Sequence, residues 1–187
     1  AGALSSDPER AILSGQELGL ARPYGTWQEL FEAEQGNVQC ISIVTPNDSH
    51  AEIATAAIQS GFHVVLDKPM TRTLDEAKAL VEIATSESQM FAMTYTYTGY
   101  PMIREMKARI ANGEIGSVRN VSVSYRQGWL SDSIENEGQK QALWRTNPEL
   151  CGAGALGDIG SHAEQLARFV TSQSIQSVRG DVHSVVK

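Results

Sequence analysis

The sequence has few cysteines and no long apolar run, and both absences narrow the classes of protein to consider. Its 187 residues include two cysteines, Cys40 and Cys151, in no CxxC arrangement. This argues against a disulfide scaffold or a structural zinc site and indicates a reducing setting. No run approaches the ~18 apolar residues of a membrane span, and the first residues lack the charged start and apolar core of a signal peptide. We expect a cytoplasmic protein with no metal site.

Clusters of basic residues are also missing. The chain carries 15 Lys and Arg against 22 Asp and Glu, a net charge of -7, and its pI is near 5.1. Nucleic acids and anionic membranes attract clustered Lys and Arg, so we expect neither as a partner and favour a small molecule instead. With 41% hydrophobic and 20% charged residues, the composition is typical of globular proteins, and the length suits one or two domains.

The first half of the chain alternates strand and helix signals. The strand candidates are short and nearly continuously apolar, as in sheets buried on both faces. The helix candidates have an apolar stripe, a polar capping residue at the start and often a glycine at the end. This alternation predicts a parallel, doubly wound α/β sheet. The predicted strands are 38–44, 62–66 and 90–94, and the predicted helices cover 8–18, 27–35, about 47–60 and 73–84.

The second half follows another pattern. Residues 101–112 predict an amphipathic helix with Met102 and Met106 facing inward, and 118–125 alternate like a strand with one exposed face. A polar stretch, 127–148, precedes a glycine-rich loop and a helix over 158–171. An alternating strand from Ile175 is still running at the last residue, Lys187. The first four residues look like the end of a strand, so we expect that the chain is a fragment.

Lys68 is the first candidate for chemistry. The apolar residues 64–66 lead directly into Asp67, Lys68 and Pro69. Ligands of open α/β sheets bind outside the carboxyl ends of the strands, which would place the Lys68 amine beside a ligand. Pro69 ends the strand and holds Lys68 in an extended backbone. The alternative is a surface lysine at a strand end with proline as ordinary punctuation.

Asp158 and His162 form the second candidate. Their four-residue spacing at the start of the predicted helix places the carboxylate and the imidazole on one face. Asp158 would then hold one ring nitrogen of His162 and leave the other free to exchange a proton. Two alternatives stay open. Asp158 is a favoured helix-capping residue beside an incidental histidine, or the pair are two ligands of a metal whose third ligand is not visible.

The run 152–157 matches the dinucleotide fingerprint GxGxxG letter by letter, but its context does not fit. The fingerprint needs a strand before the glycines and a βαβ unit around them, and 147–151 is not a strand. We predict instead that these glycines allow a close approach of the chain as it turns into the next helix.

Other parts of the sequence hold weaker candidates for ligand-binding residues. His50 is either near a cofactor or a solvated residue of a first helical turn, and Trp144-Arg145 offers a guanidinium to a phosphate or carboxylate or forms a surface salt bridge. Three tyrosines, Tyr95, Tyr97 and Tyr100, carry hydroxyls suited to a polar substrate, with packing as the alternative for each.

Taken together, these motifs resemble the glucose-fructose oxidoreductase / inositol dehydrogenase family (Gfo/Idh/MocA). The resemblance rests on four runs: 43–47 with His50, 67–69, 144–145 and 157–162. It implies an NAD(P)-binding Rossmann domain at 1–97 with part of its parallel sheet. It also implies, at 98–187, part of an α/β substrate domain with an open, largely antiparallel sheet that makes homo-oligomers.

The resemblance also implies roles for particular residues. The family's catalytic lysine falls on Lys68, and its Asp/His pair falls on Asp158 and His162. The implied cofactor contacts are Ser5, Ser6, Arg10, Thr45, Pro46, His50, Asp67, Lys68, Trp144 and Arg145.

Two features depart from the family pattern. The lysine motif of the family usually begins with Glu, whereas Asp67 stands here, a shorter carboxylate. The family's first strand and glycine-rich loop would precede Ala1, so we expect that this polypeptide alone lacks a cradle for the pyrophosphate.

Cofactor choice depends on the residue near the end of the second strand, which is acidic in NAD-binding Rossmann folds. By resemblance this residue is Ser5, uncharged and close to Ser6 and Arg10, which favours NADP. Asp7 lies two residues away and suits NAD.

The sequence therefore predicts an NAD(P)-dependent oxidoreductase that interconverts a secondary alcohol of a sugar or cyclitol and its ketone. His162 would remove the hydroxyl proton, Lys68 would stabilise the developing alkoxide, and Asp158 would orient His162. The alternative is a non-catalytic sensor of the same fold that binds a nucleotide or sugar. A sensor has no chemical need for all three residues, which favours the enzyme.

Overall fold

The computed structural model describes residues 1–183, and its contacts divide the chain into two compact units. The first unit contains 1–45, 49–66 and 74–92. The second unit contains two short segments, 46–48 and 67–73, together with the chain from Met93 onward. The segment 67–73 directly follows a strand of the first unit, and the segment 46–48 begins three residues after the end of another.

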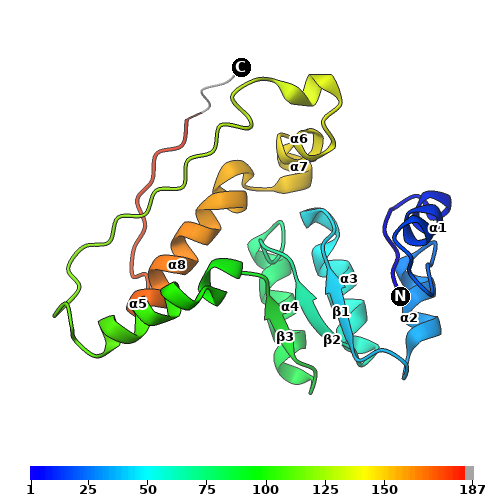
Figure 1. The fold of residues 1–187 in the computed structure, drawn as a ribbon, viewed down its shortest axis with the longest axis horizontal. Helices are drawn as coiled ribbons and strands as arrows, with labels where there is room; N and C mark the ends of the chain where they lie inside the picture. Colours follow the sequence, from blue (N-terminus) through cyan, green and yellow to red (C-terminus); the bar gives the residue numbers. More distant parts are fainter. Residues whose placement is uncertain (184–187) are drawn as a thin grey trace. The chain divides into compact units, whose positions relative to one another are not determined.

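A three-stranded sheet forms the centre of the first unit, in the order β1-β2-β3 (Figure 1). Its strands are β1 (Cys40–Ile43), β2 (His63–Leu66) and β3 (Phe91–Met93). β1 and β2 are parallel, with Cys40 opposite His63 and Ile43 opposite Leu66, so their carboxyl ends lie at the same edge. The predicted parallel α/β sheet is confirmed, with each strand one to three residues shorter than its apolar run.

Four helices belong to the first unit, and the sequence predicted each of them. They are α1 (Pro8–Glu17), α2 (Trp27–Glu34), α3 (His50–Gln59), which follows a single 3₁₀ turn η1 (Asn47–Ser49), and α4 (Leu74–Ser86). A polar residue caps α1 as predicted: the Asp7 carboxylate accepts a hydrogen bond from the Arg10 amide at 2.8 Å. α3 contacts both β1 and β2 and packs beside α4. The apolar core includes Ala54, Ala57, Ile58, Phe62, Val64, Leu66 and Leu80.

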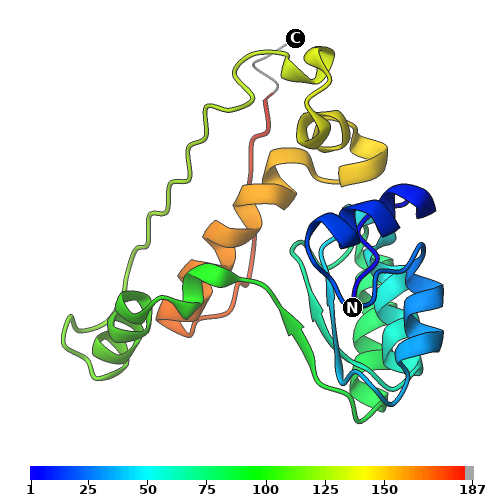
Figure 2. The same cartoon turned by 45° about the vertical axis from the view of Figure 1, so that its right-hand side comes forward.

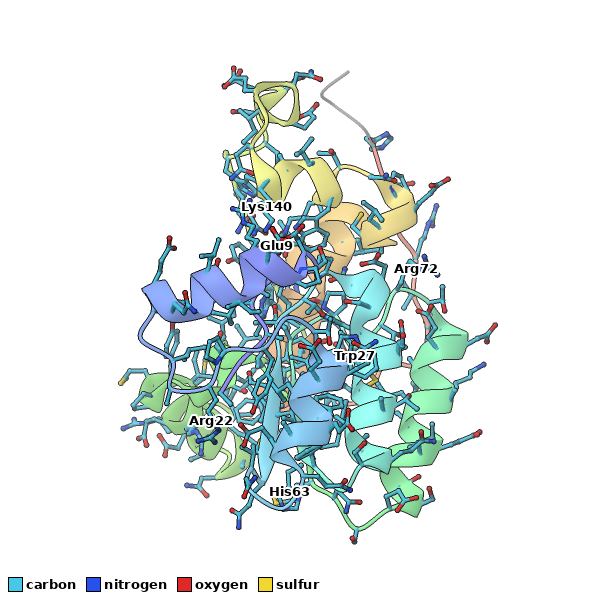
Figure 3. All side chains as sticks on the ribbon, turned by 90° about the vertical axis from the view of Figure 1, so that its right-hand side faces the viewer. Glu9, Arg22, Trp27, His63, Arg72 and Lys140 are labelled. Carbon is cyan, nitrogen blue, oxygen red and sulfur yellow. The ribbon has the colours of Figure 1, made fainter. Side chains whose placement is uncertain are left out.

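A buried carboxylate connects α2 to the segment before it. The Glu34 side chain is fully buried and accepts hydrogen bonds from the Arg22 guanidinium at 2.5 and 2.9 Å and from the Tyr24 hydroxyl at 2.8 Å. Figure 3 labels Arg22, and it also labels Trp27, the first residue of α2. The hydrogen bonds from Arg22 and Tyr24 satisfy the charge of the Glu34 carboxylate, which would otherwise be costly to bury.

The regular structure within the described residues of the second unit is helical. Its longest helices, α5 (Pro101–Ala111) and α8 (Ser161–Thr171), pack against each other (Figure 2). The Lys107 ammonium lies 4.1 Å from the centre of the Phe169 ring at this contact. Shorter elements were not predicted within the polar stretch or around the glycine loop. They are η3 (Ile134–Glu137), α6 (Lys140–Arg145), α7 (Pro148–Cys151) and the π-helix η4 (Leu156–Gly160). Another short helix, η2 (Thr96–Gly99), precedes α5.

The predicted strands of the second half are not formed. Residues 118–125 and the described residues from Ile175 to 183 are irregular, and within 1–183 neither pairs with another strand. A single strand leaves its backbone groups without partners, so alternation alone does not make a sheet. Met102 and Met106 were predicted to face inward but are 74% and 39% exposed. The end of the predicted last strand, 184–187, lies outside the described residues. No helix within the described part of the chain is long and apolar enough to cross a membrane.

Candidate active site

Lys68 lies two residues after β2 and is held by a residue ninety positions later in the chain. Its ammonium nitrogen donates to Asp158 Oδ1 at 2.5 Å and to the Asp158 carbonyl oxygen at 2.7 Å. Both groups belong to the second unit, and their side chains are only 12% and 22% exposed. The peptide bond between Lys68 and Pro69 is cis. Lys68 is thus a fixed, largely buried cation, which excludes the alternative of a solvated surface lysine.

Asp158 also faces a second cation. Arg145 Nε lies 3.3 Å from Asp158 Oδ2, an ion pair without the alignment of a hydrogen bond. The Arg145 guanidinium stacks over the Trp144 ring, 4.3 Å from its centre, and bonds to the Gln141 side chain. The structure therefore shows a salt bridge between Arg145 and a carboxylate of its own chain. Because the Arg145 side chain is only 22% exposed, this is not a salt bridge on the open surface.

The predicted hydrogen bond between Asp158 and His162 is absent from the described residues. Asp158 lies in the π-helix η4, whose bonds close over five residues, so a four-residue spacing no longer has the register of an α-helix. The Asp158 carboxylate instead forms ion pairs with Lys68 and Arg145. His162 lies at the start of α8, and its buried Nδ1 has no hydrogen-bond partner in the described chain.

Burial and charge determine the proton affinity of His162. Desolvation lowers its pKa below 6.5, and the nearby charge of Lys68 lowers it further, against the weaker opposing effects of Asp158 and Asp67. The imidazole is therefore neutral at ordinary pH and available to accept a proton.

Aromatic rings surround His162. Its ring centre lies 4.8 Å from that of Tyr97, 5.7 Å from Tyr95 and 6.4 Å from Tyr125. The hydroxyl oxygens of Tyr97 and Tyr125 are 2.5 Å apart, and this hydrogen bond together with burial raises the pKa of Tyr97 to about 12. Tyr95 and Tyr97 were candidates from the sequence, whereas Tyr125 was missed because it was read only as one position of an alternating strand.

The glycine run is not a phosphate loop, as predicted. It follows the short helix α7 and leads into a π-helix, with no strand before it. Gly152 has φ of 75°, and a Cβ there would lie 2.8 Å from the Arg72 carbonyl oxygen, so this position requires glycine. Beyond this turn, a cavity of about 100 Å³ is lined by residues that include Trp129, Arg145, Gly154 and Asp158.

The predicted cofactor residues of the first unit lie in two places. Around the start of α1, the Ser5 hydroxyl accepts a hydrogen bond from the Asp7 amide at 3.1 Å, and the Ser6 and Arg10 side chains are exposed. After β1, His50 is fully buried with its Nε2 at 2.8 Å from the Thr45 carbonyl oxygen. His50 is therefore not a solvated helix-start residue; it braces the turn that follows the strand.

Two further predicted residues belong to the second unit. Pro46 precedes the buried Asn47, whose side-chain amide donates to the Cys151 carbonyl at 3.0 Å. The Asp67 carboxylate accepts a hydrogen bond from the Thr94 hydroxyl, the residue directly after β3. Within residues 1–183 no group of three or more potential metal ligands is present.

The parallel sheet and the helices that alternate with its strands define an α/β protein of the Rossmann type. The chain belongs to the GFO/IDH/MocA oxidoreductase family. Residues 1–95 match the oxidoreductase family with an NAD-binding Rossmann fold, and 103–187 match the GFO/IDH/MocA C-terminal domain.

Individual relatives agree with this assignment. An uncharacterized oxidoreductase YfiI of Bacillus subtilis is 32% identical, and a levoglucosan dehydrogenase of Pseudarthrobacter phenanthrenivorans is 29% identical. The matches cover 91% and 90% of this chain, but only 45% and 41% of the relatives. The crystal structure of an inositol dehydrogenase homolog complexed with NAD+ from Azotobacter vinelandii is 39% identical, with a TM-score of 0.84 over 91% of this chain and 45% of that one. The chain thus spans less than half the length of these relatives.

Proposed function

We propose that this chain is part of an NAD(P)-dependent oxidoreductase that interconverts a secondary alcohol of a sugar or cyclitol and its ketone. The observation that carries the proposal is the fixed Lys68 ammonium on Asp158, with a neutral His162 at the start of the next helix. Two relatives, a levoglucosan dehydrogenase and an inositol dehydrogenase homolog, support the substrate class.

In this proposal His162 is the general base. The lowered pKa keeps its imidazole neutral, so it can remove the hydroxyl proton as the carbon–hydrogen bond breaks. A bound nicotinamide supplies the acceptor for the hydride that leaves the carbinol carbon. In the reverse direction His162 returns the proton to the oxygen.

Lys68 stabilises the oxygen on which negative charge develops. An ammonium group has three N–H donors, and the two bonds to Asp158 leave one for a substrate oxygen. Since Asp158 already fixes the ammonium, little reorganisation is needed during the reaction, which makes such an interaction effective. Asp158 therefore acts on Lys68, where the sequence had predicted that it acts on His162.

The donors near α1 fit the ribose end of a dinucleotide. Ser6 and Arg10 are exposed, and hydroxyl and guanidinium donors suit a 2′-phosphate, so we retain the preference for NADP. Thr45 and Pro46 follow β1, at the edge of the sheet where dinucleotides bind. His50 would contribute through Thr45, and Arg145, which stacks on Trp144, through the cavity that it lines beside Asp158.

Three further expectations belong to the same proposal. We expect the domain boundary near residue 97. We expect the second half to form an open antiparallel sheet, once its strands pair with other strands, and this sheet to make a homo-oligomer. We also expect the protein to be cytoplasmic.

The proposal is tested by incubating the full-length protein with a panel of sugars and polyols, each with NAD and with NADP, and following the absorbance of the reduced nicotinamide. We expect turnover with at least one cyclitol or sugar, and its loss in His162→Ala. Binding of cofactor and sugar without any turnover would contradict the enzyme and favour the sensor.

A further inference from the structure

His162 lacks the support that a catalytic histidine usually has. No carboxylate or carbonyl oxygen accepts from its buried Nδ1 within residues 1–183, and Asp158, one turn before it, is engaged by two cations. A ring nitrogen normally depends on such a partner to fix its tautomer and orientation. Another element must therefore hold this ring.

The tyrosine cluster, defined as Tyr95, Tyr97 and Tyr125, is in a position to do so. The planes of Tyr95 and Tyr97 meet the imidazole plane at 88° and 69°, the edge-to-face arrangement that aromatic rings prefer. The Tyr97 ring centre is the nearest, at 4.8 Å. Tyr97 thus forms the wall against which the imidazole packs.

Tyr97 is itself held by Tyr125. Their hydroxyl oxygens are 2.5 Å apart and their ring centres 5.9 Å apart. Tyr125 is half-buried although both of its neighbours along the irregular segment, Ser124 and Arg126, are exposed. The Tyr125 side chain therefore reaches inward from an otherwise exposed stretch to make this contact.

We propose that Tyr97 is the positioning residue of His162: its ring, held by the hydroxyl bond to Tyr125, fixes the plane of the imidazole and shields Nδ1 from water in place of a carboxylate. Removing the Tyr97 ring admits water to His162, which favours the charged imidazolium and raises its pKa. The groups near His162 are the charges of Lys68, Asp158 and Asp67 and the rings of the three tyrosines of the cluster. The inference rests on the proposed function only for its effect on turnover.

The test measures the pKa and tautomer of His162 by NMR of isotope-labelled histidine, with the resonance assigned by its loss in His162→Gln. In Tyr97→Leu we expect the pKa to rise by roughly 0.5 to 1 unit and the single tautomer to become a mixture. Tyr97→Phe and Tyr125→Phe each delete the same hydroxyl bond, so their smaller shifts should be equal and should not add in the double variant. The two phenylalanine variants keep the test decisive if Tyr97→Leu does not fold.

Tyr100→Phe is the matched control, because Tyr100 is 56% exposed and its ring contacts Tyr97 but not His162. It should leave the histidine resonance unchanged. An unaltered pKa and tautomer in Tyr97→Leu would overturn the proposal, as would additive shifts in the two phenylalanine variants. A rise in KM at constant kcat in Tyr97→Phe, with the resonance unchanged, would make Tyr97 a substrate contact instead. Because the resonance is read without turnover, an inactive wild type would refute the proposed reaction and leave this test intact.

Discussion

Asp158 holds Lys68 through two different oxygens, its carboxylate Oδ1 at 2.5 Å and its own main-chain carbonyl at 2.7 Å. The carbonyl belongs to the π-helix η4, so the helix backbone itself orients the ammonium. π-turns of this kind are often found at functional sites. The position of Lys68 therefore depends on the shape of a segment ninety residues away as well as on the Asp158 charge.

The first prediction concerns stability. Asp158→Asn keeps the main-chain bond but leaves the charges of Lys68 and Arg145 without their anion, and we expect a loss of about 1–3 kcal/mol in the free energy of unfolding, measured by urea titration. The matched control is Asp75→Asn, whose carboxylate is 98% exposed and 4.0 Å from Lys78; it should change stability by less than about 0.5 kcal/mol. Equal effects of the two substitutions would show that Asp158 does not compensate the two cations.

The second prediction concerns catalysis. Removing a general base typically costs roughly 10² to 10⁴ in rate, so His162→Ala should lose that much in kcat while cofactor affinity, measured by fluorescence titration, is retained. Lys68→Met should lose at least as much, and Asp158→Asn should fall between wild type and His162→Ala. His183→Ala serves as the control, since His183 is exposed. Near-normal kcat in both His162→Ala and Lys68→Met would refute the assigned roles.

The third prediction concerns pH. Because burial and Lys68 lower the pKa of His162, the acidic limb of the kcat/KM profile should lie below 6.5. In the same range the unfolded chain binds more protons than the folded one, so the folded state should lose stability as pH falls from 6.5 through the folded pKa. The difference in unfolding free energy between wild type and His162→Gln should therefore vary with pH below 6.5 and level off above it. A difference that is independent of pH would contradict the lowered pKa.

The fourth prediction concerns the cofactor. In the proposed function Ser5 stands at the position that is acidic in NAD-binding folds, and Arg10 is exposed, so we expect a higher kcat/KM with NADP than with NAD. Arg10→Ala should lower the efficiency with NADP and leave that with NAD unchanged. Glu9→Ala is the control, a neighbouring exposed residue of the same helical turn. A tenfold or greater preference for NAD in the wild type would contradict the prediction.

Sequence patterns alone determined the helices and strands of the first unit and the family to which the chain belongs. Apolar runs, capping residues such as Asp7 and terminal glycines predicted every helix and strand of the parallel sheet, because these signals are local. The motifs around Lys68, Asp158 and His162 also indicated the oxidoreductase family. A family motif consists of residue types in a fixed order, which can be recognised in the sequence without the three-dimensional geometry.

Only the tertiary structure decided how those groups are connected. A four-residue spacing implied that Asp158 supports His162, but the π-helix changed the register and the cations Lys68 and Arg145 took the carboxylate. The contact between Tyr97 and Tyr125 joins residues 28 positions apart, which no local pattern encodes. Alternation at 118–125 predicted a strand, yet a strand needs a partner, and within residues 1–183 none is paired with it. Periodicity records which face of a segment is apolar; the partner that covers that face is a property of the folded chain.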